Sequence, residues 1–393
     1  MRGFSLIGKQ VLLRLLAALL FSWAVYGAVN FWTLRHWDSG ESLVVHLLAA
    51  GAERKVPSSS GEDTAEEETF QMLERPLTVR LLTGAQKGET HDLLVTRLAG
   101  TGVDPTPGGR YLLVQDSFED GARQYSIADA FRLPAVAGIV SFTSSLLLVF
   151  AGWSGFRALL GLGISILCLL WGVVPLIVAG WSPIPLGFAA ALITSVATVA
   201  CVVRRSRYRT VALLGSLGGV TGGFLWGVVM VFMWKLTGLA GESAALLAST
   251  LPGIDIRGVL LASVIIGAIG AVLDVGISIT ASMAELVDYD PDIPLRRLWY
   301  AGMHVGGEML GSMINTLILA YIGSSMATVL LITNAGAEIR GLFNDPYIAE
   351  ELVQSLAGTV GLLLTIPFTA SFFVLQERYS RQSETEKQDG KAT

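Results

Sequence analysis

Two neighbouring stretches, GVLLASVIIGAIGAVLDVGISITASMAELVD (258–288) and AGMHVGGEMLGSMINTLILAYIG (301–323), decide the class of this chain. Each is long and apolar enough to cross a bilayer, which takes about 20 predominantly apolar residues. Each also carries a carboxylic acid, Asp274 near the middle of the first and Glu308 in the second. Ionisable groups at membrane depth normally face a protein interior or a watery cavity, and they are functional candidates. We therefore expect the functional site on this pair of helices.

The composition places the whole chain in the membrane class. Hydrophobic residues occupy 52% of the 393 positions and charged residues 15%, and there are 44 glycines. Soluble globular proteins have fewer hydrophobic and more charged residues, and glycine is commoner in membrane helices than in soluble ones. No basic patch suggests binding of nucleic acid. Cys168 and Cys201 fall in predicted membrane helices, so neither a disulfide framework nor a cysteine metal site is expected.

Runs of roughly 20 apolar residues predict eight transmembrane helices. They are residues 10–32, 134–153, 157–179, 184–203, 210–236, 258–286, 301–323 and 355–376. The first run follows Arg2, Lys9 and Arg14, as a cleaved signal peptide would. Its length and its aromatic residues favour an uncleaved anchor instead.

Basic residues in short loops predict the orientation, because cytoplasmic loops carry an excess of Lys and Arg. With eight spans, four basic groups fall on one face of the membrane. They are the N-terminal group, Arg204, Arg205, Arg207 and Arg209 after span four, Arg296 and Arg297 after span six, and Arg378, Arg381, Lys387 and Lys391 after span eight. We therefore expect both termini in the cytoplasm.

The polar block at 34–133, after an anchor over 1–33, is then extracytoplasmic. It contains a linker at 56–69 that is rich in Ser, Glu and Asp and is expected to be disordered. Three strand-like runs follow it, separated by Gly, Pro and Asp turns. They are LTVRLLTG (77–84), HDLLVTRLAG (91–100) and GRYLLVQDS (109–117). The predicted fold is an all-α polytopic membrane protein with about eight transmembrane helices and a small extracytoplasmic β-rich domain.

The helical domain is predicted over 134–376, followed by a disordered cytoplasmic tail at 377–393. Within it, the segment near 324–354 begins with SSMATVLLITNAG, which is too short to span and reads as a re-entrant or interfacial piece. Span five carries glycines at four-residue spacing, which favours close helix packing, with a flexible gating helix as the alternative. These are Gly215, Gly219, Gly223 and Gly227.

Helical periodicity groups the polar residues of spans six and seven, because positions four, seven or eleven apart share a face. One set is Asp274, Ser278 and Glu285, and the other is His304, Glu308, Gly311 and Asn315. The two spans run in opposite directions, so Asp274 and Glu308 are expected at similar depth near the midplane. Two such carboxylates can bind a cation or share a proton. The alternative is that the polar residues only hold helices together.

The segments GAIGAVLDVGISITASMAEL (267–286), AGMHVGGEMLGSMINTLILAYIGSS (301–325) and GTVGLLLTIPFTA (358–370) resemble the YibE/F family of bacterial multipass membrane proteins. The resemblance implies a permease-like protein of the bacterial cytoplasmic membrane. The chain departs from the family pattern at His304, Gly307 and Glu308, where the resemblance implies Asn, Arg and Asp. Without a basic residue at 307, the acid at 308 loses an ion-pair partner.

The leading hypothesis is a permease or secondary transporter that moves a small solute or ion. Its proton- or cation-binding residues would be Asp274, Glu308, Ser278, Asn315, Thr316 and His304. The partners expected are the lipid bilayer and the solute, and a homo-oligomer is compatible with the sequence. No cofactor and no enzymatic activity are predicted.

Two alternatives remain open. The first is a scaffold or sensor that transports nothing and whose extracytoplasmic domain binds a partner. The second is an intramembrane aspartyl protease, in which two acids share a proton. The protease is disfavoured, because AVLDVG around Asp274 lacks a Gly-x-Gly-Asp arrangement and the second acid is a glutamate.

Overall fold

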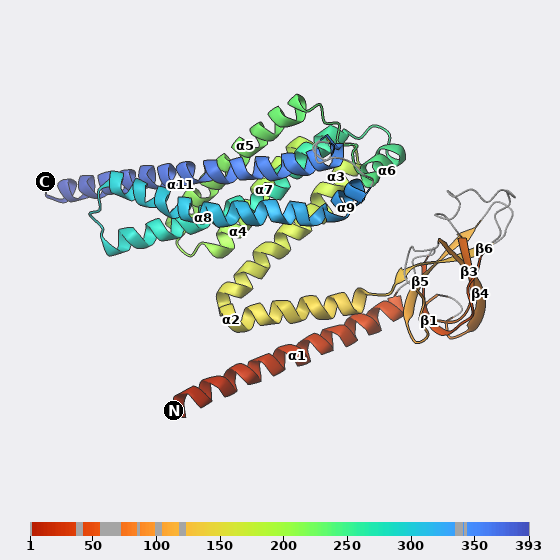
Figure 1. The fold of residues 1–393 in the computed structure, drawn as a ribbon. Coiled ribbons are helices and arrows are strands. Elements are labelled where there is room, and N and C mark those ends of the chain that lie inside the picture. The colour runs from red at the N-terminus through yellow and green to blue at the C-terminus, as the bar shows by residue number, and fades with distance from the viewer. Residues whose placement is uncertain are drawn as a thin grey trace. The chain divides into compact units, whose positions relative to one another are not determined.

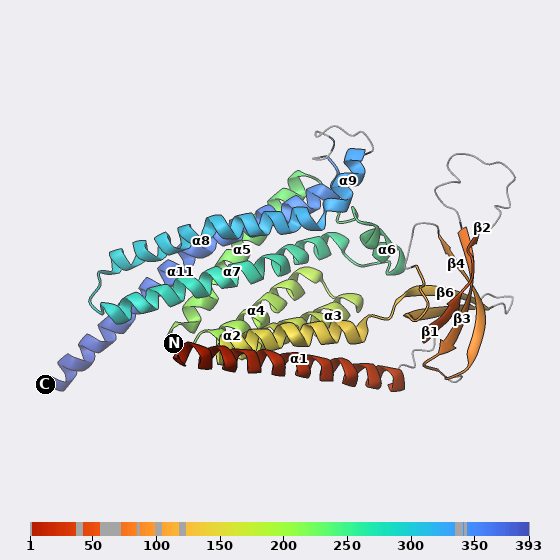
Figure 2. The ribbon, with the colours of Figure 1, turned by 60° about the horizontal axis from the view of Figure 1, so that its bottom comes forward.

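The computed structural model describes residues 2–36, 42–55, 72–84, 87–98, 104–117, 123–334, 341 and 344–392. The chain forms two compact units, Met1–Gly152 and Trp153–Thr393. Each unit has its own hydrophobic core. Figures 1 and 2 show the strands in the first unit and most of the helices in the second. The predicted linker at 56–69 lies outside the described residues.

The first unit holds one long helix, six strands and the beginning of a second helix. These are α1 (Arg2–His36), β1 (Ser42–Ala50), β2 (Arg54–Lys55), β3 (Met72–Leu81), β4 (Thr90–Leu98), β5 (Arg110–Ser117), β6 (Arg123–Ala130) and α2 (Leu133–Leu167). Close packing joins α1 to α2, since Ser22 Oγ donates a hydrogen bond to the carbonyl of Gly138 at 2.5 Å. A Cβ at Gly138 would lie 3.3 Å from that of Tyr26, so the two helix backbones approach closely.

Five of the strands close into a small barrel. Strand β1 pairs with both β3 and β5, β4 pairs with β6, and β2 extends the edge of β3. All pairs are antiparallel except β4 with β6. This order is that of an OB-type Greek-key barrel. Alternate residues fill the barrel, as the two-residue repeat of a strand requires; they include Val45, Leu47, Leu77, Val79, Tyr111 and Leu113. The predicted small β domain is confirmed, but β1, β2 and β6 were not among the predicted strands.

A buried side chain closes the barrel where β1 begins. Thr83 is 2% exposed and its Oγ1 accepts a hydrogen bond from the fully buried backbone N–H of Val44 at 2.8 Å. A Thr83→Val change should lower the free energy of unfolding of the barrel by about 1–3 kcal/mol, because the buried N–H would lose its acceptor. Hydrogen–deuterium exchange of β1 in the full chain would measure this.

Thr78→Val is the matched control, because the Thr78 hydroxyl bonds to Asp92 in an exposed position. Equal exchange of β1 in both variants would contradict the role assigned to Thr83.

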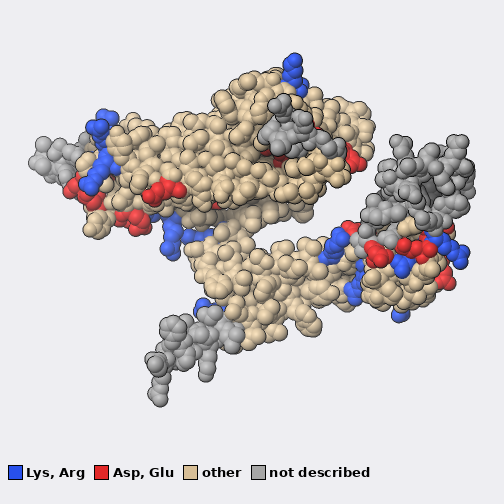
Figure 3. All heavy atoms as spheres, viewed as in Figure 1, with Lys and Arg blue, Asp and Glu red and all other residues tan. Residues whose placement is uncertain are grey.

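The second unit is a helical bundle. Its elements after α2 are η2 (Cys168–Val173), α3 (Val174–Val178), α4 (Pro183–Val202), η3 (Ser206–Tyr208), α5 (Arg209–Met233), α6 (Glu242–Thr250), α7 (Ile256–Tyr289), α8 (Leu295–Ser324), α9 (Met326–Asn334) and α11 (Pro346–Ala392). Helix α11 packs against α5, α7 and α8 (Figure 2). Figure 3 shows that most of the drawn surface of this bundle carries no charge and that charged side chains gather mainly toward its ends.

Seven helices in the described part of the chain are long and apolar enough to cross a membrane. One of them, Leu133–Val178, has 46 residues, about 69 Å at 1.5 Å per residue, or twice the roughly 30 Å of a hydrocarbon core. Gly152 interrupts it with a φ of 56° and a ψ of −131°, a region that favours glycine. The predicted spans 134–153 and 157–179 lie largely on either side of Gly152, so eight predicted spans correspond to seven helices.

The glycines of α5 pack directly on α11. A Cβ at Gly223 would lie 2.5 Å from the carbonyl oxygen of Ala357, and one at Gly227 would lie 3.3 Å from the Cβ of Ala357. Gly215 and Gly219 meet Thr369 and Thr365 of α11 in the same way. The interpretation of the glycine spacing as close packing is therefore confirmed.

The described residues after α8 include the helices α9 and α11. The predicted re-entrant piece forms the nine-residue helix α9, and α11 then starts at Pro346, earlier than the predicted span. The predicted disordered tail at 377–393 is helical as far as Ala392. The reason is its content of Glu, Gln, Lys and Arg, which favour helix, together with ionic contacts at its first turns.

Candidate functional site

Asp274 lies about midway along α7, with the buried residues Leu273 and Val275 beside it. The neighbouring residues pack into the bundle core, whereas Asp274 itself is exposed on the protein surface. It lines a pocket of about 430 Å³ between α4, α7 and the part of α2 that belongs to the second unit. The pocket therefore adjoins the most deeply buried helix of the bundle at mid-length.

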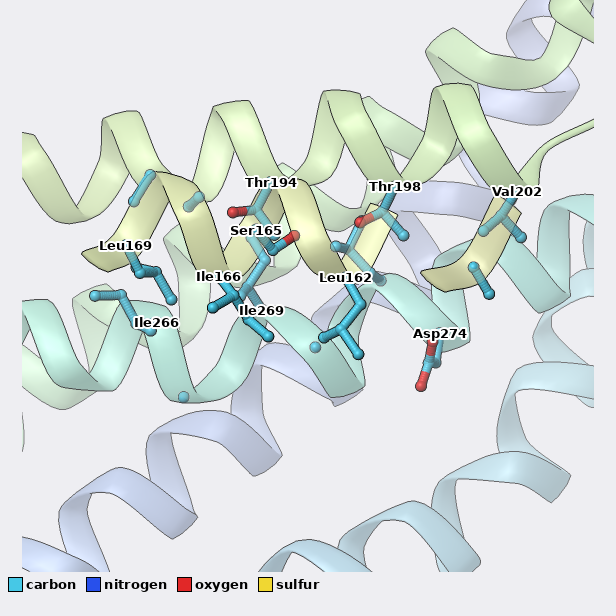
Figure 4. A pocket seen from close by; sticks show the side chains of 16 residues that line it. Leu162, Ser165, Ile166, Leu169, Thr194, Thr198, Val202, Ile266, Ile269 and Asp274 are labelled. Carbon is cyan, nitrogen blue, oxygen red and sulfur yellow. The ribbon is translucent and has the colours of Figure 1, made fainter. Parts of the chain in front are cut away.

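Four polar side chains line this pocket within an apolar wall. They are Ser165, Thr194, Thr198 and Asp274. Of the described residues that line the pocket, Asp274 is the one with an ionisable side chain. Ser165 is buried and donates its hydroxyl to the carbonyl of Gly161 at 2.9 Å. In Figure 4 the three hydroxyl-bearing side chains lie between α2 and α4, and Asp274 lies at one end with its carboxylate directed away from them. The pocket thus carries one negative charge at one end and hydroxyl groups further along its wall.

Glu308 lies in different surroundings, on the outer face of α8. Its Oε1 is 3.3 Å from Nε2 of His304, one turn earlier, and the two side chains are 72% and 79% exposed. Asn315 and Thr316 are exposed on the same side of the helix, and Thr316 Oγ1 donates to the carbonyl of Ser312 at 2.9 Å. We call the residues His304, Gly307, Glu308, Gly311, Asn315 and Thr316 the α8 polar face.

Glycines on the opposite side of α8 explain this separation. The buried residues of α8 are Leu298, Gly302 and Gly306. A Cβ at Gly302 would lie 2.6 Å from the sulfur of Met283 on α7, and one at Gly306 would lie 2.8 Å from Cγ1 of Ile366 on α11 and 2.9 Å from Ile279 on α7. Helix α8 therefore meets α7 and α11 through its small residues, and these contacts turn Glu308 and His304 outward.

The predicted site residues are thus brought together only in part. Glu308 and His304 form a pair and share a face with Asn315 and Thr316, whereas Asp274 lines the pocket with α2 and α4. No hydrogen bond or ion pair joins Asp274 to Glu308 in the part of the chain that the structure describes. Ser278 is half-buried one turn after Asp274 and does not line that pocket.

A second group of polar residues was missed by sequence reasoning. Tyr321, Ser325, Glu351 and Ser355 line a small pocket of about 60 Å³ between α8, α9 and α11. Ser355 is 3% exposed, and neither its Oγ nor Oε2 of Glu351 has a hydrogen-bond partner among the described residues. The signal in the sequence is the pair Glu350–Glu351 at the start of an apolar helix.

An ionic group joins the loop between α4 and α5 to α7 and α11. Glu377 is 5% exposed, and its two carboxylate oxygens accept from Arg207 at 2.8 Å and from Arg381 at 3.3 Å. Arg205 binds Asp288 at the end of α7, and this hydrogen bond raises the pKa of Arg205 above its ordinary value. The Arg207–Glu377 and Arg205–Asp288 pairs hold the basic loop, the end of α7 and the late part of α11 at one end of the bundle.

No cluster of three or more His, Cys, Asp or Glu side chains suited to a metal ion occurs within the described ranges. Cys168 and Cys201 are free, half-buried thiols.

A comparison with known protein families places the helical bundle in one of them. The model of a family described as YibE/F-like protein matches residues 139–378, which include α4 to α9 and most of α11. No curated protein and no solved structure matches the chain. The matched range contains both Asp274 and the α8 polar face.

Proposed function

Since the chain belongs to the YibE/F family and is an integral membrane protein, we propose that it is a permease or secondary transporter for a small cationic or polar solute. Asp274 would bind the transported or coupling cation, which is a metal cation or a proton. Ser165, Thr194 and Thr198 would contribute hydroxyl oxygens to the solute elsewhere in the same pocket.

One observation carries the proposal: a pocket midway along a membrane helix holds a single carboxylate in an otherwise apolar wall. An aspartate at the centre of a membrane helix costs about 2.5–3.5 kcal/mol on insertion scales. A role in holding helices together does not explain this cost. Asp274 is exposed, and no hydrogen bond among the described residues joins its side chain to another helix. A role in binding a solute accounts for a charge in this place.

We also propose that the protein lies in the bacterial cytoplasmic membrane with both termini in the cytoplasm. The Arg205–Asp288 and Arg207–Glu377 pairs support one shared face for the loop after α4, the end of α7 and the late part of α11. Arg205 and Arg207 belong to this loop, and they contact the other two regions directly. Short loops rich in arginine normally lie on the cytoplasmic side of the membrane.

The proposal is tested by flux into liposomes that contain the purified chain and a trapped pH-sensitive dye, under an imposed Na⁺ or pH gradient. Asp274→Asn keeps the shape of the side chain and removes its charge. It should slow flux at least about tenfold, because a charge-assisted contact of about 1.5–3 kcal/mol is lost.

Glu285→Gln is the matched control, since Glu285 is an exposed acid on the same helix and lies outside the pocket. It should leave flux within about twofold of the wild type. Equal flux from wild-type protein and the Asp274→Asn variant would overturn the transport role of Asp274. Absence of any gradient-driven flux in the wild type would favour the scaffold or sensor, with the barrel of the first unit as the partner-binding part.

A further inference from the structure

The α8 polar face is exposed at membrane depth. In the most apolar 18-residue stretch of α8, 6% of the residues are buried inside the protein. The corresponding share for α7 is 61%, so α8 lies at the outside of the bundle. His304 and Glu308 are 79% and 72% exposed, and Asn315 lies two turns further along on the same side. Ionisable and amide groups that face hydrocarbon are costly and normally meet protein or water. Something other than lipid tails must therefore cover this face.

We propose that a second copy of this chain covers the α8 polar face, with the two α8 helices side by side about a two-fold axis normal to the membrane. All copies in one membrane share an orientation, so such an axis brings residues of equal depth opposite one another. The face is then its own partner, and each copy supplies half of the interface.

The chemistry of the face is self-complementary. Each copy carries one acceptor, Glu308, and one ring that can donate, His304, one turn apart. The axis places the two Glu308 side chains opposite each other, and the imidazole of the other copy lies one helical turn away. Each carboxylate can accept from that imidazole over one turn, the same step that Glu308 and His304 bridge at 3.3 Å within one chain. Asn315 has both donor and acceptor atoms, so two asparagines can pair with each other. Polar pairs of this kind hold membrane helices together.

The backbone of the face allows close approach. Gly307 and Gly311 lie one turn apart, and a Cβ at either position would have no protein atom within 4 Å. Gly302 and Gly306 of the same helix would meet Met283 and Ile366. Among the described residues, no atom therefore packs where the side chains of the first pair would be, and its small-xxx-small spacing suits a contact between helices of two copies. This dimer would form whether or not the chain transports a solute.

The test is the number of subunits per particle, counted by single-molecule photobleaching of the labelled full chain in liposomes at several protein-to-lipid ratios. Wild-type protein should be dimeric. The Gly307→Leu/Gly311→Leu double variant should raise the monomer–dimer dissociation constant at least about tenfold, because two leucines would separate the helices. Its thermal stability should match the wild type, since a Cβ at either position has no described protein atom within 4 Å.

Gly163→Leu on α2 is the control for adding a leucine, because a Cβ there also has nothing within 4 Å; it should remain dimeric. A second measurement uses a variant without Cys168 and Cys201. Gly311→Cys in that background should form an inter-chain disulfide on oxidation, whereas Leu225→Cys, at a 59% exposed position of α5, should not.

A wild type that is monomeric at every ratio would overturn the proposal. So would a double variant that dimerises as well as the wild type, or a Gly311→Cys protein that stays at single-chain mass while the wild type is dimeric. In the last case the dimer would use another face, and α8 would be covered from within its own chain.

Discussion

Replacing Gly223 with leucine is expected to prevent the helical bundle from assembling. A Cβ at Gly223 would lie 2.5 Å from the carbonyl oxygen of Ala357 and 3.1 Å from the backbone N and Cα of Gly361. These are backbone atoms of α11, so no side chain can rotate away, and α5 must separate from α11. The free energy of unfolding should fall by about 3 kcal/mol or more, at the upper end of overpacking costs.

The loss is large because packing contacts, rather than the hydrophobic effect, hold helices together in a membrane. Thermal unfolding in detergent and the yield of monodisperse protein would measure it. Gly223→Ala should give a smaller loss than leucine, and Gly163→Leu, which meets no protein atom within 4 Å of its Cβ, should give almost none. If Gly223→Leu unfolds at the temperature of the wild type, α5 and α11 do not approach this closely.

Removing the Glu377 carboxylate is expected to have the second-largest effect. Glu377→Ala would leave Arg207 and Arg381 beside each other without the buried carboxylate that both contact. Breaking a buried pair from one side costs about 3–5 kcal/mol. The arginines are 43% and 30% exposed, so water can offset part of the loss. We expect a destabilisation of about 2–3 kcal/mol, measured by chemical or thermal unfolding.

Asp288→Ala provides the comparison at the same end of the bundle. Asp288 pairs with Arg205, and both side chains are 45% exposed. An exposed pair contributes about 0–1 kcal/mol, so this variant should unfold close to the wild type. Equal destabilisation of the two variants would show that burial of Glu377 does not set its contribution.

The sequence allowed the membrane class, the small β domain and the close packing of α5 to be predicted. Each of these depends on local pattern: apolar length, alternation in strands, and glycines at four-residue spacing. Strand β1 was missed because its run SLVVHLLAA (42–50) stands between the anchor and a polar linker, apart from the other strands. Glu377 was assigned to a solvated tail, because no pattern in its vicinity indicated Arg207 as a partner.

The composition of the candidate site could not be predicted for a different reason. Periodicity shows which residues share a face on one helix, but it does not show which face meets the neighbouring helix. Here Gly302 of α8 meets Met283 of α7, and Gly306 meets Ile366 of α11; these contacts turn Glu308 outward. The hydroxyls near Asp274 come from α2 and α4, more than 70 residues earlier, and they resemble ordinary lipid-facing threonines and serines in sequence.

The position of α11 in the chain has a consequence for biogenesis. Helix α5 ends at Met233, and the helix that covers its glycines begins at Pro346. Ribosomes add about 5–20 residues per second, so α5 waits on the order of 10 s before its partner is made. During that time α11 has not been synthesised, so the glycine-lined side of α5 lacks the helix that it contacts in the folded protein. The bundle therefore cannot assemble in the order of its synthesis, and α5 enters the membrane well before its main contacts exist.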